Sequence, residues 1–213
     1  VDQCSQALSD IFHLGVGGKD VNTRKVEPRN TPTVVNAAFN HRNFWDGRAN
    51  NTFNGVDPFG RRSILADPTA RIVLMRGATP VPQVLQLPNM SAASQAVGPP
   101  RSEFEMACAG RSFADIGRRL LRKTALASPG QRVAPDDSVF GAGGPVGPLL
   151  RPTGVGLAHT YGELVRKAFQ KDLVRGSGFW RINPDGTLAR AADVASGYTQ
   201  VELNFSLFFG LAI

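Results

Sequence analysis

The sequence is poor in the residues that bind transition metals. It contains two cysteines, Cys4 and Cys108, and three histidines, His13, His41 and His159. None of them forms the His-x-x-x-His or Cys-x-x-Cys pattern of a zinc site. The sequence also has no Gly-x-Ser-x-Gly motif, which would mark a hydrolase nucleophile. Residue spacing alone therefore indicates neither a metal centre nor a hydrolase.

The sequence also lacks the long apolar run of a membrane protein. No stretch approaches the roughly 20 apolar residues that cross a bilayer as a helix, so we expect no membrane span. The chain starts at Val1 without an initiator methionine or a signal peptide, and it stops inside the apolar run 204–213 without a helix cap. We therefore expect a processed or partial polypeptide.

Positive charge is in excess but is not concentrated. The chain has 24 Lys and Arg residues against 17 Asp and Glu residues, which gives a formal net charge of +7. These basic residues are scattered, whereas a nucleic-acid-binding surface gathers them beside aromatic residues that stack on bases. We therefore expect no nucleic-acid partner.

The remaining composition is that of a globular protein with many turns. Hydrophobic residues make up 42% of the chain and charged residues 19%, which are ordinary values. The 23 glycines and 15 prolines favour turns and long loops. The length of 213 residues suits one large domain or two small ones. We expect well under half of the chain in regular structure.

The first half of the chain is predicted to hold short elements. Residues 1–28 lack periodicity and are predicted to be loop. Thr31 can cap a short helix that begins at Pro32. β-Branched residues on both sides of Gly77 predict an edge hairpin over 71–87. Helical spacing of apolar residues predicts two further short helices, over 90–97 and 113–123.

The second half begins with a connection over 128–155 that is rich in glycine and proline. Thr160 and Glu163 have the spacing of a capping box, which predicts a helix over 160–171. A turn at 183–186 then separates this helix from a final helix, which begins near Ser196 and runs into the apolar end of the chain.

Three motifs resemble those of one enzyme family. Arg-Asn-Thr-Pro is found at 29–32 and Phe-Trp-Asp-Gly-Arg at 44–48. Further on, Gln-Ala-Val-Gly-Pro at 95–99 is followed by Glu-Met at 105–106. Together and in this order they resemble the bacterial di-haem cytochrome c peroxidase family, which includes related di-haem oxidases that modify tryptophan in a partner enzyme.

The resemblance implies a fold and a domain organisation. It implies a mainly α-helical, loop-rich, cytochrome c-like fold. Residues 55–88 look like an insertion relative to the family, and we expect this insertion to hold a small β-hairpin. We expect residues 1–150 to form a portion of the peroxidatic haem domain, and residues 151–213 to form a helical continuation toward the second haem domain.

The resemblance also implies two c-type haems and a calcium ion. The chain has no Cys-x-x-Cys-His motif, which attaches such a haem. Both haems would therefore be attached through sequence outside this chain, in the remainder of the polypeptide or in a companion chain. Asn30 matches a family position that helps to bind calcium, although it could equally form a turn hydrogen bond. His13 is a weak candidate for an axial haem ligand.

Three residues have catalytic roles by resemblance. Trp45 would relay electrons between the haems, with core packing as the alternative. Glu105 would lie over the peroxidatic haem, where peroxide cleavage moves one proton from the inner to the outer oxygen. The alternative is a surface glutamate such as Glu103. Gln95 would donate hydrogen bonds in the pocket or lie on a helix surface.

Basic residues have alternative roles. Arg29 and Arg48 could hold haem propionates, or they could pair with Asp46. The basic cluster over 111–123 could be a solvated helix face, or a docking surface for an acidic partner or for haem propionates.

We therefore expect a periplasmic or secreted di-haem peroxidase-like oxidoreductase. It would reduce hydrogen peroxide with electrons from a donor cytochrome or cupredoxin. One alternative is a non-catalytic electron-transfer or scaffold subunit. Another is a di-haem oxidase or oxygenase that acts on a partner protein or a polymer.

Cys4 and Cys108 are expected to form a disulfide. Two cysteines without metal-binding spacing are normally paired in a protein that matures outside the cytoplasm. Free thiols are the alternative.

Overall fold

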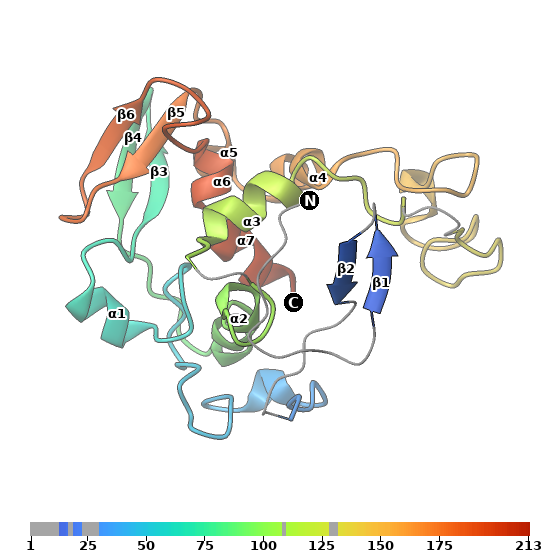
Figure 1. Cartoon of the computed structure of the whole chain (residues 1–213), viewed down its shortest axis with the longest axis horizontal. Helices are drawn as coiled ribbons and strands as arrows, with labels where there is room; N and C mark the ends of the chain where they lie inside the picture. Colours follow the sequence, from blue (N-terminus) through green and yellow to red (C-terminus); the bar gives the residue numbers. More distant parts are fainter. Residues whose placement is uncertain (1–12, 17–18, 23–29, 108–109, 128–131) are drawn as a thin grey trace.

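The computed structural model describes residues 13–16, 19–22, 30–107, 110–127 and 132–213. Within these residues the chain forms seven short α-helices and three two-stranded antiparallel sheets (Figure 1). The helices are α1 (Arg61–Ala66), α2 (Ser91–Ala96), α3 (Phe113–Leu120), α4 (Tyr161–Ala168), α5 (Lys171–Val174), α6 (Gln200–Leu203) and α7 (Phe205–Ala212). The strands are β1 (His13–Val16), β2 (Lys19–Asn22), β3 (Ile72–Arg76), β4 (Thr79–Gln83), β5 (Phe179–Ile182) and β6 (Leu188–Ala191). Short 3-10 helices occur at Ala37–Phe39, Pro99–Arg101 and Gly147–Leu149.

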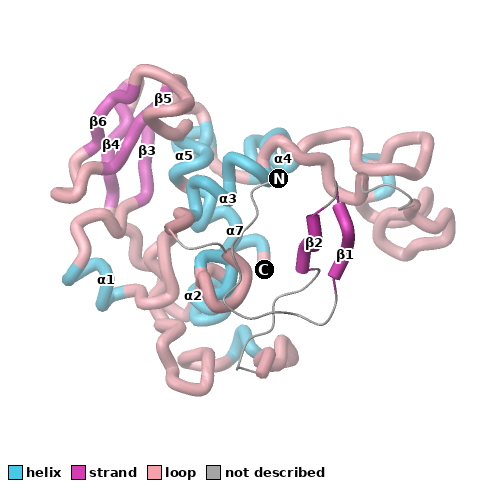
Figure 2. Tube along the Cα trace, viewed as in Figure 1, coloured by secondary structure: helices cyan, strands magenta, loops and turns pink. Residues whose placement is uncertain are grey.

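The predicted mainly α-helical, cytochrome c-like class is wrong for the described residues. The longest helices have eight residues, and loops join every element (Figure 2). Three hairpins are present where one was predicted. Frequent glycine and proline residues explain the short elements, because both interrupt helices and favour turns. The expectation that less than half of the chain is regular is confirmed within the described residues.

The hairpins follow local turn chemistry. The predicted hairpin over 71–87 is confirmed as β3 and β4, and Gly77 supplies the positive φ of 63° that its tight turn requires. Pro80 and Pro82 lie in β4, which has no second neighbour in its sheet. The predicted turn over 183–186 is also present, but it joins β5 to β6. The β1–β2 hairpin falls where only loop was predicted.

Helix starts follow side-chain caps. The predicted capping box of Thr160 and Glu163 is confirmed at the start of α4. The same arrangement caps α3 through Ser112 and Asp115, and it also caps α6. The helix predicted from Pro32 is wrong, because residues 31–36 form no helix and are followed by a single 3-10 turn. Asn36 precedes that turn with a left-handed φ of 59°, which an α-helix does not accept.

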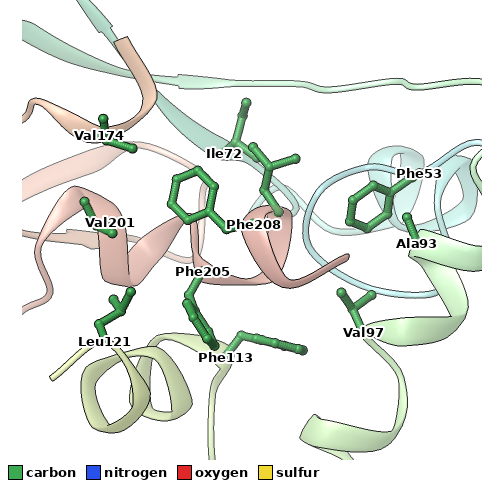
Figure 3. Packing of buried hydrophobic residues seen from close by; sticks show 11 residues of the cluster. Phe53, Ile72, Ala93, Val97, Phe113, Leu121, Val174, Val201, Phe205 and Phe208 are labelled. Carbon is green, nitrogen blue, oxygen red and sulfur yellow. The ribbon is translucent and has the colours of Figure 1, made fainter. Parts of the chain in front are cut away.

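The apolar core lies around α7. Phe205 and Phe208 of α7 belong to a cluster of buried residues from many parts of the chain, which includes Phe53, Phe113 and Val201 (Figure 3). The residues of this core come from both the 1–150 and the 151–213 segments. Helix α3 crosses α7 closely, since a Cβ added at its Gly117 would lie 2.6 Å from the Cβ of Phe205. Glycine at that position therefore sets the distance between the two helices.

Buried amides fix the hairpin of the insertion to the C-terminal helices. The amide of Asn204 accepts a hydrogen bond from the N–H of Val73 and donates one to its carbonyl, both at 2.7 Å. Asn204 also donates to the carbonyl of Leu173 at 3.1 Å. Gln200 donates to the Val73 carbonyl and accepts from the N–H of Gly176. Both amides are fully buried. The backbone of strand β3 is thus bound by Gln200 of α6 and by Asn204, which directly follows α6.

Candidate functional site

The Phe-Trp-Asp-Gly-Arg motif lies in a tight loop that is anchored to α2. Asn43 and Ala49 close this loop through two backbone hydrogen bonds of 3.3 Å. The buried side chain of Asn43 donates to Ser91 Oγ at 3.0 Å, at the first residue of α2. Phe44 and Gly47 both have a φ of 65°, so the chain turns sharply on either side of Trp45. The anchored turn projects the indole away from the core.

Trp45 is 86% exposed. The alternative of core packing is therefore excluded within the described structure. Among the described residues, eight large apolar side chains are at least 70% exposed, and six of them lie in two short segments, 34–45 and 104–106, that overlap or adjoin the motifs. These six are Val34, Val35, Phe39, Trp45, Phe104 and Met106.

Arg48 connects the motif internally. Its guanidinium donates to both oxygens of Asp46 at 3.1 Å and lies 3.7 Å from the centre of the Phe44 ring. Partial burial acts to raise the pKa of Asp46, but hydrogen bonds from the backbone and side chain of Arg48 outweigh it and lower this pKa. The predicted alternative, an ion pair between Arg48 and Asp46, is present.

The Gln-Ala-Val-Gly-Pro and Glu-Met motifs pack against the Phe-Trp-Asp-Gly-Arg loop. Gly98 follows α2, and a Cβ added to it would lie 3.1 Å from Cζ of Phe44. Glu105 lies in the next turn, with Oε1 at 3.9 Å from Nη2 of Arg48 and only 11% of its side chain exposed. The structure thus brings Phe44, Arg48, Gly98 and Glu105 together. Gln95 lies partly buried on α2, three residues before Gly98.

The two neighbouring glutamates lie in different surroundings. Glu103 is exposed and lines an open cavity of about 480 Å³ with Arg71, Arg101 and Phe113 among its walls. Glu105 does not line this cavity and instead faces Arg48. Glu103 is therefore the surface glutamate of the pair, whereas Glu105 is largely covered.

A small cavity opens beside the motif loop. It has a volume of about 180 Å³. Its walls are formed by Arg42, Asp46, Gly47, Arg48, Asn50, Phe59 and Arg62. Arg42 and Arg62 are not predictable as partners from the sequence, because no spacing pattern relates two arginines that converge only through the fold. The only sequence feature that points to Arg42 is its position two residues before the Phe-Trp-Asp-Gly-Arg motif.

The remaining predicted site residues are not brought to this cluster. Asn30 is exposed and lies outside any helix or strand. In the described part of the chain, no group of three or more His, Cys, Asp or Glu side chains could hold a metal ion. Arg29, Cys4 and Cys108 lie outside the described residues. His13 begins β1.

The basic cluster on α3 is divided by the fold. Arg118 pairs with Glu202 of α6 at 3.2 Å, donates to the Val194 carbonyl at 2.8 Å and lies over the Tyr198 ring at 4.3 Å. This side chain therefore joins α3 to the C-terminal helices. A docking role for the cluster cannot depend on Arg118.

No helix among the described residues is long and apolar enough to cross a bilayer. Neither curated proteins nor solved structures gave a match to the chain. A family model for di-haem cytochrome c peroxidase matches residues 3–140, more than half of the chain. The three motifs, at 29–32, 44–48 and 95–106, all fall within this match. The chain therefore belongs to the di-haem cytochrome c peroxidase family.

Proposed function

We propose that this chain is part of a di-haem peroxidase that reduces hydrogen peroxide with electrons relayed between two haems. Membership in the family supports an oxidoreductase that uses c-type haem. The observation that carries the proposal is the convergence of the covered Glu105 carboxylate with Arg48, in the motif whose Trp45 projects outward. A proton-transfer group and an oxidisable ring are thus presented by one small region.

The residues of this region fit a haem that is attached elsewhere. A haem offers apolar faces and two carboxylate arms, and the region offers exposed apolar side chains beside a cavity lined by arginines. Arg48 and Arg29 would hold propionates. When bound, the haem supplies the redox chemistry of peroxide reduction.

Glu105 would move the proton that peroxide cleavage requires. Its carboxylate would accept the proton from the inner oxygen and return it to the outer oxygen. Arg48, at 3.9 Å, keeps the carboxylate in position through charge attraction. Gln95 would donate a hydrogen bond in the same pocket. Because Glu105 is only 11% exposed, bulk water has limited access to the transferred proton.

Trp45 would carry electrons between the haems. An indole can be oxidised transiently, and this one is free to contact groups that the chain itself does not supply. The exposed indole would be covered by the remainder of the polypeptide or by a companion chain that carries the haem-attachment motifs.

The wider context of the proposal follows the family. We infer a periplasmic or secreted protein whose electrons come from a donor cytochrome or cupredoxin. Residues 1–150 would belong to the peroxidatic haem domain and residues 151–213 would continue toward the second haem domain.

Exchange of Glu105 for Gln tests the proposal. Glutamine keeps size and polarity but does not shuttle a proton, so the rate of peroxide reduction should fall by roughly 10² to 10⁴, the usual contribution of acid–base catalysis. Glu103→Gln is the matched control, because Glu103 lines a different cavity two residues away. Peroxide consumption by the haem-loaded protein would be measured for both.

Three results would contradict this assignment. Loss of activity only in the Glu103 variant would mean that the wrong carboxylate was chosen. Full activity in both variants would remove the peroxidase mechanism. Absence of peroxide consumption in the unmodified protein would favour a non-catalytic subunit, or an oxidase that acts on a partner or polymer.

Calcium between the haem domains is a separate part of the proposal. The amide oxygen of Asn30 is a hard ligand of the kind that calcium prefers, although calcium needs roughly six to eight oxygens in total. Asn30→Ala should therefore weaken the dependence of activity on added calcium, measured by titration after chelation. If neither chelator nor substitution changes activity, calcium has no role here.

A further inference from the structure

The small cavity beside the motif loop carries uncompensated positive charge. Three guanidinium groups line it, from Arg42, Arg48 and Arg62, together with the carboxylate of Asp46. Asp46 binds Arg48 through both of its oxygens. This ion pair compensates one of the three positive charges. Within the part of the chain that the structure describes, neither Arg42 nor Arg62 forms an ion pair. Two cationic side chains therefore face this cavity without an anion.

The same cavity is rich in hydrogen-bond donors. Arg42 uses Nη1 to donate to the Gly47 carbonyl at 3.2 Å, which fixes its side chain across the loop. A guanidinium has five N–H groups, so further donors remain on Arg42. The amide oxygen of Asn50 accepts from the Thr52 N–H at 2.9 Å, while its NH₂ group has no acceptor among the described residues. The cavity can therefore supply donors from three side chains to one acceptor group.

Its size limits what can enter. The volume of about 180 Å³ is below the roughly 300–1,000 Å³ of pockets that bind drug-sized molecules. One carboxylate with a short carbon arm can enter, but a whole cofactor cannot.

We propose that this cavity binds a carboxylate group through Arg42 and Arg62. The planar guanidinium fork matches the two oxygens of a carboxylate, and charge-assisted hydrogen bonds of this type are strong. The carboxylate has two sources. It belongs either to a haem propionate, in which case the inference rests on the proposed function, or to a small free dicarboxylate.

The experiment uses the haem-loaded protein and two adjacent substitutions. Arg62→Gln removes one lining guanidinium. Arg61→Gln removes the same charge one residue earlier in α1, from an exposed side chain that does not line the cavity. Malonate binding is measured by calorimetry, and the haem midpoint potentials are measured by spectroscopic titration. Neither measurement requires peroxide turnover, so failure of this inference is distinct from failure of the proposed function.

A free carboxylate as the ligand predicts saturable malonate binding at one site. Arg62→Gln should then raise the dissociation constant about tenfold or more, as expected for loss of a hydrogen-bonded charge partner, while Arg61→Gln should leave it unchanged. A propionate as the ligand predicts no malonate binding. Arg62→Gln should then shift one midpoint potential to a more negative value, because loss of a nearby positive charge disfavours the gain of an electron, and Arg61→Gln should not. Absence of malonate binding together with identical potentials in all three proteins would overturn the proposal.

Discussion

At the scale of single residues, exposure separates functional from structural aromatic side chains. Trp45 is 86% exposed, whereas Trp180 lies partly buried in β5, donates from its indole N–H to the Ser177 carbonyl at 3.1 Å and lies beside Arg190. The second tryptophan has partners within the chain, and the first projects into solvent. The two residues therefore form a natural pair for a matched comparison.

Trp45→Phe should preserve the fold and slow electron transfer between the haems. Because the side chain is exposed, the free energy of unfolding should change by no more than about 0.5 kcal/mol. Phenylalanine keeps an aromatic ring but is much harder to oxidise, so the relay should be impaired. Stopped-flow absorption spectroscopy of the two haems measures the transfer, and Trp180→Phe is the control. Unchanged transfer in the Trp45 variant would show that the ring has no relay role.

At the scale of elements, the capping residue of α3 is coupled to the segment before α6. Asp115 receives a hydrogen bond of 2.7 Å from the Tyr198 hydroxyl and also caps α3 through Ser112. Burial acts to raise the pKa of Asp115, but hydrogen bonds from Tyr198 and Ser112, with the nearby charge of Arg118, outweigh it and lower this pKa. The ionised carboxylate thus ties α3 to the segment before α6.

Asp115→Asn should lower stability in a pH-dependent manner. The pKa of this carboxyl is lower in the folded state than its ordinary value of 3.8. Its contribution is therefore present above about pH 4 and is lost as the pH falls through the lower folded-state value. We expect a loss of about 1 kcal/mol at neutral pH, typical of a weakened hydrogen bond. Urea unfolding at a series of pH values should show the two proteins converging in acid, and a constant difference would contradict this account.

Local chemistry explains which elements were predictable. The β3–β4 hairpin and the capped start of α4 depend on residues that are close in sequence, such as Gly77 and the pair Thr160 and Glu163. The β5–β6 hairpin was missed although its turn was recognised, because its two four-residue strands are too short to show clear alternation. The buried amide of Asn204 could not be predicted, since a polar residue gives no sign of a partner 131 residues away.

In the candidate site, too, features that depend on nearby residues were predictable and those that depend on distant residues were not. The resemblance placed the motifs, but only the fold shows that Glu105 faces Arg48 while Glu103 lines another cavity. Arg42 and Arg62 were missed because their shared cavity depends on the path of the loop between them. Sequence reasoning found residues within motifs and overlooked those that meet through tertiary structure.

At the scale of the whole molecule, one core spans the chain. Phe53 and Phe113 pack with Phe205 and Phe208 in a single cluster. The ion pair between Arg118 and Glu202 adds a polar link between the same regions. Damage to the last helices is therefore expected to loosen the motif-bearing region as well.

The predicted disulfide between Cys4 and Cys108 concerns stability at this scale. Closing such a long loop should stabilise the protein by roughly 4 kcal/mol in the chain-entropy view, less any strain. Thiol labelling of denatured, unreduced protein, followed by mass spectrometry, should detect no free cysteine. Reduced protein is the control and should take two labels. Two labels without reduction would disprove the bond.

The two hydrogen bonds between the buried Asn204 amide and the backbone of Val73 also have a consequence for the order of folding. Strand β3 receives its buried hydrogen bonds from a residue 131 positions later. The hairpin can form early from local contacts, but it cannot dock until residue 204 has left the ribosome. Contacts of such long range slow folding, because a long loop must close before they form. During synthesis the backbone of Val73 therefore stays open to other hydrogen-bond partners until residue 204 has emerged.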